Sequence, residues 1–395
     1  MKPIMSVEKA AKIRSQSERY REEWVVWRRS AVAGFRGRWR RWRLSRIEKW
    51  LRKHIVELTC FLGHPEGSIR SQAHSLISDL LWYQAIGSKE ILAGAVAPSI
   101  SNLSHESGAV RQGALHTITG LIEAGISPDS FERAVLPTAA DLRNPSRALR
   151  SSAQITARIL AAKRIAPLLL TEAIMPSVDN LIVPHWYDIG ELRLLVSYAG
   201  WTLKTMLEME VGYEVFGECI PTLAGFLTSD VGGYTSTPAT EILVDVARRG
   251  IGPERWEQVI PHLIELLGSS LEPFRFLRGM GERANAQRVL TACAQGGIGL
   301  VALLQAVQPS LDNIEIGHEP GRAALTTLEA LVKRGVGRDT IAAALFDPAR
   351  AGGIRCGSYP SVYSRPSARV QAPTPTLCTT ISRMNRAAAP GKPLC

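Results

Sequence analysis

A short segment that ends in proline recurs along the chain. Its copies end at Pro98, Pro137, Pro176, Pro221, Pro261 and Pro309, which are 39, 39, 45, 40 and 48 residues apart. Two copies align closely: GISPDSFERAVLP at residues 125–137 and GIGPERWEQVIP at residues 250–261. In a further copy, at residues 53–62, His54 takes the place of the proline. A period of roughly 20–50 residues is typical of repeat proteins, in which each unit buries its apolar face against its neighbours.

Each repeat has the spacing of two helices. Apolar residues recur every three or four positions around the proline and again further on, as in Leu115, Ile118 and Ile122. The second segment commonly opens with an arginine, at Arg70, Arg111, Arg150, Arg193 and Arg322. This is the helical period, and the alternation of a β-strand is absent. We therefore expect an all-α chain of paired helices, each of about 12–18 residues.

The residues at the expected helix ends are of the types that helix termini favour. Ser127, Pro128 and Asp129 have the order of an N-cap, a proline at the first helical position and an acid in the first turn. A helix C-terminus favours a residue that tolerates positive φ, and glycine occurs there at Gly125, Gly250, Gly297 and Gly335.

The pattern resembles that of HEAT repeats, a family of HEAT/armadillo-like α-solenoids. The proline within the first helix and the arginine that opens the second match the family's signature. The aspartate usually found between them is not consistently present, and Glu106, Pro145 and Ser269 occupy comparable positions. The resemblance implies a right-handed α-solenoid of about seven HEAT-like helix pairs over residues 54–348. An eighth unit begins at Gly335 and stops near Pro348.

The distribution of charge divides the chain into three parts, and the middle part coincides with the repeats. Residues 1–53 carry 17 basic and 5 acidic side chains, a net charge of +12. Residues 350–395 carry 7 basic side chains and no acid, and the residues between the two ends carry 23 basic and 31 acidic side chains. We expect a basic N-terminal helical arm at 1–53, an acidic solenoid at 54–348 and a disordered basic tail at 349–395.

The arm is the first candidate binding segment. Residues 35–46 contain six arginines and two tryptophans, and the candidate contacts are Arg36, Arg38, Trp39, Arg40, Arg41, Trp42 and Arg43. The tryptophans favour a cap that covers the open end of the solenoid. The arginines favour an anionic partner, which is a nucleic acid, a membrane surface or the acidic solenoid itself.

Two insertions interrupt the repeat and form the second set of candidates. The first is VPHWYDIG at residues 183–190, with His185, Trp186 and Tyr187. The second lies at residues 269–283, with Phe274, Arg275, Phe276 and Arg278. Insertions in repeat proteins map to loops on one edge, which is often a binding edge. The alternative is that these aromatic side chains fill local gaps in the packing.

Motifs of catalysis, metal binding and membrane insertion are missing from the sequence. The histidines form no HExxH, the six cysteines form no CxxC, and phosphate-binding and nucleophile motifs are absent. We therefore expect no catalytic residue, no metal and no cofactor. No apolar run reaches 18 residues and no signal peptide is apparent, so we expect a cytoplasmic protein.

These observations favour a non-enzymatic scaffold or adaptor that presents a curved surface to a protein partner, with possible nucleic-acid contact through the arm. The alternative is a nucleic-acid-binding protein that acts through residues 21–53. A membrane surface ranks below both, and the oligomeric state stays open. A HEAT-type DNA glycosylase ranks lowest: Asp79, Trp82 and Trp201 suggest it, but the acidic repeat region opposes the wrapping of a phosphate backbone.

Overall fold

The structure is a computed structural model that describes residues 58–82, 92–182, 189–228, 236–269, 276–316 and 318–345, together with Ser15 and Arg19 in helical conformation. Every regular element in these ranges is a helix, and they contain no strand. The chain divides into two compact units, Met1–Val215 and Phe216–Cys395. The remainder of the predicted arm at 1–53 and the predicted tail at 349–395 lie outside the described residues.

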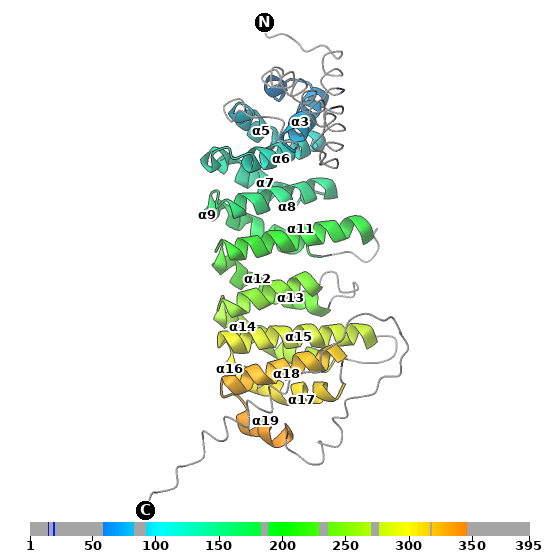
Figure 1. The fold of residues 1–395 in the computed structure, drawn as a ribbon, viewed down its shortest axis with the longest axis vertical. Helices are drawn as coiled ribbons and strands as arrows, with labels where there is room; N and C mark the ends of the chain where they lie inside the picture. The colour runs from blue at the N-terminus through cyan, green and yellow to red at the C-terminus, as the bar shows by residue number, and fades with distance from the viewer. Residues whose placement is uncertain are drawn as a thin grey trace, which may run out of the picture. The chain divides into compact units, whose positions relative to one another are not determined.

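The first unit contains four helix pairs, in each of which we call the first helix A and the second helix B. The A helices are the segment 58–61, α5 (Val96–Asn102), η1 (Pro128–Ala134) with α7 (Val135–Asp141), and α9 (Pro167–Leu170) with η2 (Thr171–Ala173) and α10 (Ile174–Asp179). The B helices are α3 (Gly67–Trp82), α6 (Gly108–Glu123), α8 (Arg147–Ala162) and α11 (Ile189–Glu208). Each B helix packs against the next, which makes a continuous layer within the unit (Figure 1).

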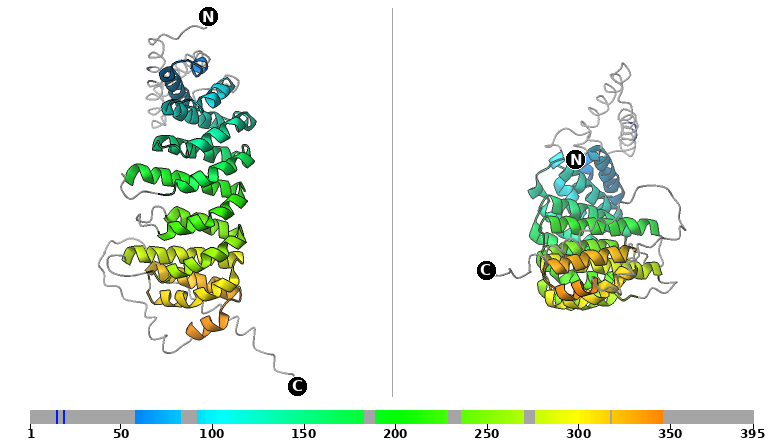
Figure 2. Two further views of the ribbon diagram at one scale, coloured as in Figure 1. Left: turned by 180° about the vertical axis from the view of Figure 1, so that it is seen from behind. Right: turned by 60° about the horizontal axis from the view of Figure 1, so that its bottom comes forward.

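The second unit repeats this arrangement. Its A helices are α12 (Tyr213–Gly225) with η3 (Phe226–Thr228), α14 (Pro253–Leu266), and α16 (Leu300–Leu303) with η4 (Leu304–Ala306) and α17 (Val307–Ile316). Its B helices α13 (Ser236–Arg248), α15 (Phe276–Gly296) and α18 (His318–Lys333) pack in series, and α19 (Arg338–Leu345) follows (Figure 2). The described residues thus hold seven helix pairs and the start of an eighth, which confirms the predicted all-α repeat.

The repeated proline explains the shape of the A helices. Pro98, Pro137, Pro176 and Pro309 are each the third residue of their α-helix, where the missing N–H would have no partner within the helix. In three of these repeats the turn before the helix is 3₁₀. Only in α12 and α14 does the proline lie in the helix interior, at Pro221 and Pro261.

The predicted glycines close the B helices. Gly125, Gly250, Gly297 and Gly335 have φ between 67° and 82°, as the sequence predicts. The residue after each glycine donates its N–H back into the helix, as Ile251 does to the Val246 carbonyl at 3.1 Å. This is a Schellman turn. In contrast, the predicted N-cap Ser127 makes no side-chain capping hydrogen bond, and its helix begins as 3₁₀.

The core lies between the A and B helices of each unit. The two closest copies of the repeated segment place Phe131 and Trp256 at the same position, and both side chains are 0% exposed. The indole Nε1 of Trp256 donates to the Ile251 carbonyl at 3.0 Å, so the buried N–H is satisfied. Aromatic residues at this position therefore anchor their repeats.

Candidate binding surface on the B helices

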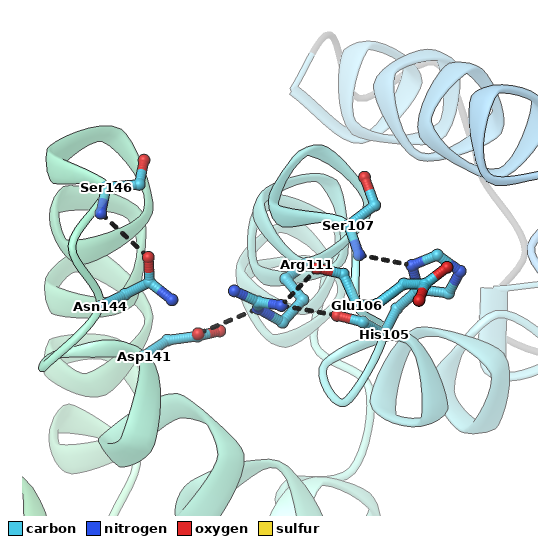
Figure 3. Close-up of polar contacts among 7 residues, drawn as sticks. All are labelled: His105, Glu106, Ser107, Arg111, Asp141, Asn144 and Ser146. Atoms are coloured by element: carbon cyan, nitrogen blue, oxygen red, sulfur yellow. Dashed lines mark hydrogen bonds and ion pairs between the residues drawn. The ribbon is translucent and has the colours of Figure 1, made fainter.

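Arginines near the start of the B helices bridge consecutive repeats. Nε of Arg111 donates to Oδ1 of Asp141 in the next A helix at 3.1 Å, and its Nη1 donates to the His105 carbonyl at 2.6 Å (Figure 3). We call an arginine and its partner in the next repeat a rung. The rung holds the B helix of one repeat, α6, against the A helix of the next, α7.

Two further rungs use asparagine in place of aspartate. Arg70 donates to Asn102 Oδ1 at 3.0 Å, and in the second unit Arg283 donates to Asn313 Oδ1 at 2.7 Å. The asparagine amide in turn donates to the carbonyl of a leucine at the end of the preceding A helix. Asn102 bonds in this way to Leu62 at 2.7 Å, Asn180 to Leu142 at 2.9 Å and Asn313 to Leu267 at 3.1 Å.

These rungs correct the sequence comparison of Glu106, Pro145 and Ser269. The loop between the two helices of one repeat supplies backbone carbonyl acceptors only, as at Glu106 and Ser269, and the side-chain acceptor does not lie there. It lies four residues after the proline of the following repeat, at Asn102, Asp141 and Asn313, because the arginine reaches across the repeat boundary. The signal was present in the sequence as asparagine or aspartate recurring at that offset.

Buried polar side chains also order the B helices relative to one another. The hydroxyl groups of four threonines each lie within hydrogen-bond distance of a carbonyl in the preceding B helix. The pairs are Thr117 with His74 at 3.4 Å, Thr156 with Leu115 at 3.3 Å, Thr202 with Gln154 at 2.9 Å and Thr327 with Gln287 at 3.0 Å. These ladder threonines define which residues of neighbouring B helices lie side by side.

Two titratable groups of the first unit are buried in this polar network. Burial and the nearby Arg70 charge lower the pKa of His74 to about 3, and its ring nitrogens lie 2.9 Å from Thr117 Oγ1 and 2.9 Å from Asn102 Nδ2. Burial raises the pKa of Asp141 although Arg111 opposes the rise. His74 is therefore neutral at physiological pH, and the Asp141 carboxylate carries a desolvation cost.

The ladder places three residues of the first unit in one row. The positions directly before Thr117, Thr156 and Thr202 are His116, Ile155 and Trp201, which are exposed, half-buried and exposed. Two positions after the same threonines are Thr119, Arg158 and Lys204. Because residues at equal offsets on aligned helices face the same way, the two rows form a strip across α6, α8 and α11. We call this strip the B-helix surface.

Trp201 is the largest side chain of the B-helix surface and is 51% exposed. Its ring packs edge-on against Tyr198 of the same helix, with ring centroids 5.7 Å apart. The guanidinium carbon of Arg158 lies 5.8 Å from the centroid of the Trp201 ring. Leu194, two helical turns before Trp201, is 54% exposed. Apolar area and positive charge thus meet at one place on the B helices.

The sequence-predicted site residues all lie outside the side chains that the structure describes. The arm residues from Arg36 to Arg43, the insertion residues from His185 to Tyr187, and Phe274 with Arg275 all lie outside the described residues. Phe276 and Arg278 lie in the first turn of α15, and their side chains are not described. These candidates stay predictions. In the sequence, Trp201 is considered only as a residue of a DNA glycosylase. The feature that indicates its place on the B-helix surface is that it directly precedes the ladder threonine Thr202.

Neither a metal-ion site nor a membrane-spanning helix occurs among the described residues. Among them, no group of three or more His, Cys, Asp or Glu side chains could hold a metal ion. None of the helices in the described ranges combines the length and the apolar character that a bilayer crossing needs.

No protein-family model matches the sequence, and no curated protein sequence matches it. Among solved structures, importin beta in an ammonium sulfate condition is similar, with a TM-score of 0.51 and 14% identity. That match covers 89% of this chain and 43% of importin beta. A designed armadillo repeat protein, YIII(Dq)4CqI, matches at 19% identity and a TM-score of 0.37, over 60% of this chain and 99% of its own. The chain has a HEAT/armadillo-like repeat fold.

Proposed function

We propose that the chain is a cytoplasmic, non-enzymatic scaffold that binds a protein partner through the B-helix surface of its first unit. The observation that carries this proposal is the exposure of Trp201 beside Leu194. The opposite side of α11 is buried through Leu195, Ala199 and Leu203, so the core does not need these two side chains. Tryptophan and arginine are the residues most enriched among the energetic centres of protein interfaces.

The rigidity of the support favours binding at this place. Thr202, next to Trp201, is hydrogen-bonded across to the Gln154 carbonyl of α8, and Tyr198 and Arg158 restrict the indole from two sides. A side chain held in place before binding loses less conformational entropy when it binds. The repeat fold itself provides an extended surface, which HEAT-like proteins use for recognition.

The test is capture of partners from native extract by the full chain and two variants. Trp201→Ala removes the centre of the proposed surface, and Leu168→Ala removes an 85% exposed side chain of α9, in the A-helix layer of the same unit. We expect at least one protein to be retained by the wild type and Leu168→Ala but reduced about tenfold by Trp201→Ala. Recovery of the same proteins in equal amounts by all three would contradict the proposal.

A second function is favoured by the charge of the arm. Residues 1–53 have a net charge of +12 and contain five of the nine tryptophans, a composition suited to phosphate contact and base stacking. If the arm binds RNA or DNA, affinity falls steeply with salt, and deletion of residues 1–53 removes that dependence. Unchanged affinity after the deletion would exclude the arm as the nucleic-acid site.

A further inference from the structure

The cation–π contact in the first unit restricts the charge of a ligand at the B-helix surface. Arg158 lies over the ring of Trp201 at 5.8 Å. A cation on an aromatic face takes up the negative potential of that face, and a second cation there meets like-charge repulsion. A lysine or arginine of a partner therefore cannot bind favourably on this face of Trp201, because Arg158 already occupies it.

Arg158 keeps its hydrogen-bonding capacity for a ligand. Among the described residues its guanidinium forms no ion pair or hydrogen bond, and the ammonium group of Lys204, three residues after Trp201, forms none in the same ranges. A guanidinium offers five N–H donors in a fork that fits a carboxylate. Its half-burial against the indole reduces the hydration that a ligand must displace.

Close to Arg158, α8 and α11 present apolar side chains and one opposing charge. Leu194 and Trp201 expose about half of their side chains, and Ile155 is half-buried beside them. Glu208 is exposed one turn beyond Lys204 on α11. Its charge repels a ligand carboxylate from that end and leaves the Arg158 side as the favoured position.

We propose that the B-helix surface binds an acidic peptide segment, whose carboxylate pairs with Arg158 and whose neighbouring large apolar side chain packs against Trp201 and Leu194. This inference rests on the proposed function, because it names the chemistry of the partner at the same surface. The sign of charge follows from the internal cation–π contact, and the apolar requirement follows from the exposed Trp201 and Leu194.

Three fluorescent 15-residue peptides test the inference against the full chain. They share the same leucine and phenylalanine positions, and their remaining positions are glutamate, glutamine or lysine. Fluorescence anisotropy at low and moderate salt measures their affinities. We expect the glutamate peptide to bind most tightly and to weaken with salt, and we expect the lysine peptide to bind least.

Two charge-matched variants locate the contact. Arg158→Gln should weaken the glutamate peptide about tenfold, because it removes a charge-assisted hydrogen bond. Arg133→Gln removes an equal charge from an exposed position of η1 in the same unit and should change the affinity little. Equal losses in the two variants would reduce the effect to net charge and overturn the inference.

Other outcomes separate this inference from the proposed function. Equal or tighter binding of the glutamine or lysine peptide, or no binding of any peptide, overturns the acidic partner. If Trp201→Ala still loses captured protein in that case, the surface binds a partner of other chemistry and the proposed function stands. If Trp201→Ala changes neither capture nor peptide binding, both proposals fail.

Discussion

The two units build their repeat interfaces at the same positions but fill these positions differently. In the second unit, Arg283 and Asn313 form a complete rung, and Gln287 Nε2 donates to Ser310 Oγ at 3.2 Å. In the first unit, the corresponding Gln154 accepts from Ser177 at 3.1 Å, but its Nε2 has no partner. All the buried side-chain atoms without a partner in the described residues lie in the first unit, at Ser99, Asp141, Arg150 and Gln154.

The same difference extends to the turns and to the titratable groups. The turns of the second unit carry glycine at both positive-φ positions, as in Gly250 and Gly252, whereas Arg164, Ala166 and Glu210 take positive φ in the first. His74 and Asp141, both buried in the network, also belong to the first unit. Neutral asparagine rungs occur in both units, at Arg70 with Asn102 and at Arg283 with Asn313. The first unit differs because it carries the unpartnered polar atoms, the non-glycine residues at positive φ and the buried His74, whose lowered pKa makes this unit less stable in acid.

Removal of a complete rung should have the largest effect. Asn313→Ala deprives Arg283 of an acceptor and the Leu267 carbonyl of a donor, so we expect a loss of about 2–3 kcal/mol in the free energy of unfolding. Asn180→Ala is the matched control, because Asn180 bonds to Leu142 and Arg150 bonds to the Asn144 carbonyl instead. It should cost about 1 kcal/mol. Urea denaturation measures both, and an equal or larger loss for Asn180→Ala would remove the contrast between the units.

The buried His74 should make the free energy of unfolding fall at acid pH. Its pKa is about 3 in the fold and 6.5 in the unfolded chain, so the unfolded state binds more protons between these values. Stability is then fully present above pH 6.5 and is lost as the pH falls, by about 1.4 kcal/mol per pH unit, or about 2 kcal/mol by pH 5. His74→Gln places at this position the amide found at Gln287 and should reduce the loss. Urea midpoints at pH 7 and pH 5 test this, and equal acid losses in the two proteins would contradict it.

The smallest effect is expected at the turns. Ala166 has φ 43° and ψ 61°, a left-handed conformation that disfavours a side chain, and the second unit has Gly299 at this place. Ala166→Gly should therefore raise the free energy of unfolding by about 0.5 kcal/mol, after the added entropy of the unfolded chain is subtracted. Thermal denaturation measures the change. A fall in melting temperature would show that the local contacts of the methyl group outweigh the strain.

Local features of the chain could be predicted from the sequence, whereas contacts between repeats could not. The prolines and Gly125, Gly250, Gly297 and Gly335 each act within one helix or turn, so their spacing was sufficient. The side-chain partner of Arg111, Asp141, lies 30 residues away in the next repeat, and the spacing within one repeat does not indicate it. Trp201 and Arg158 meet because the threonine ladder aligns α8 with α11, and helical periodicity alone does not specify that register.

The turns that close the B helices have a consequence for the order in which the chain is made. Each turn bonds back to the helix that precedes it, as Ile298 does to the Cys293 carbonyl at 2.9 Å. The donors precede the first residue of the following A helix, as Ile251 precedes Pro253, so these bonds do not require that helix. During synthesis, a B helix can therefore complete its C-terminus as soon as two further residues emerge from the ribosome. Each new A helix then packs against a B helix whose C-terminal carbonyl groups are already hydrogen-bonded. This shortens the time during which those carbonyl groups can form non-native hydrogen bonds.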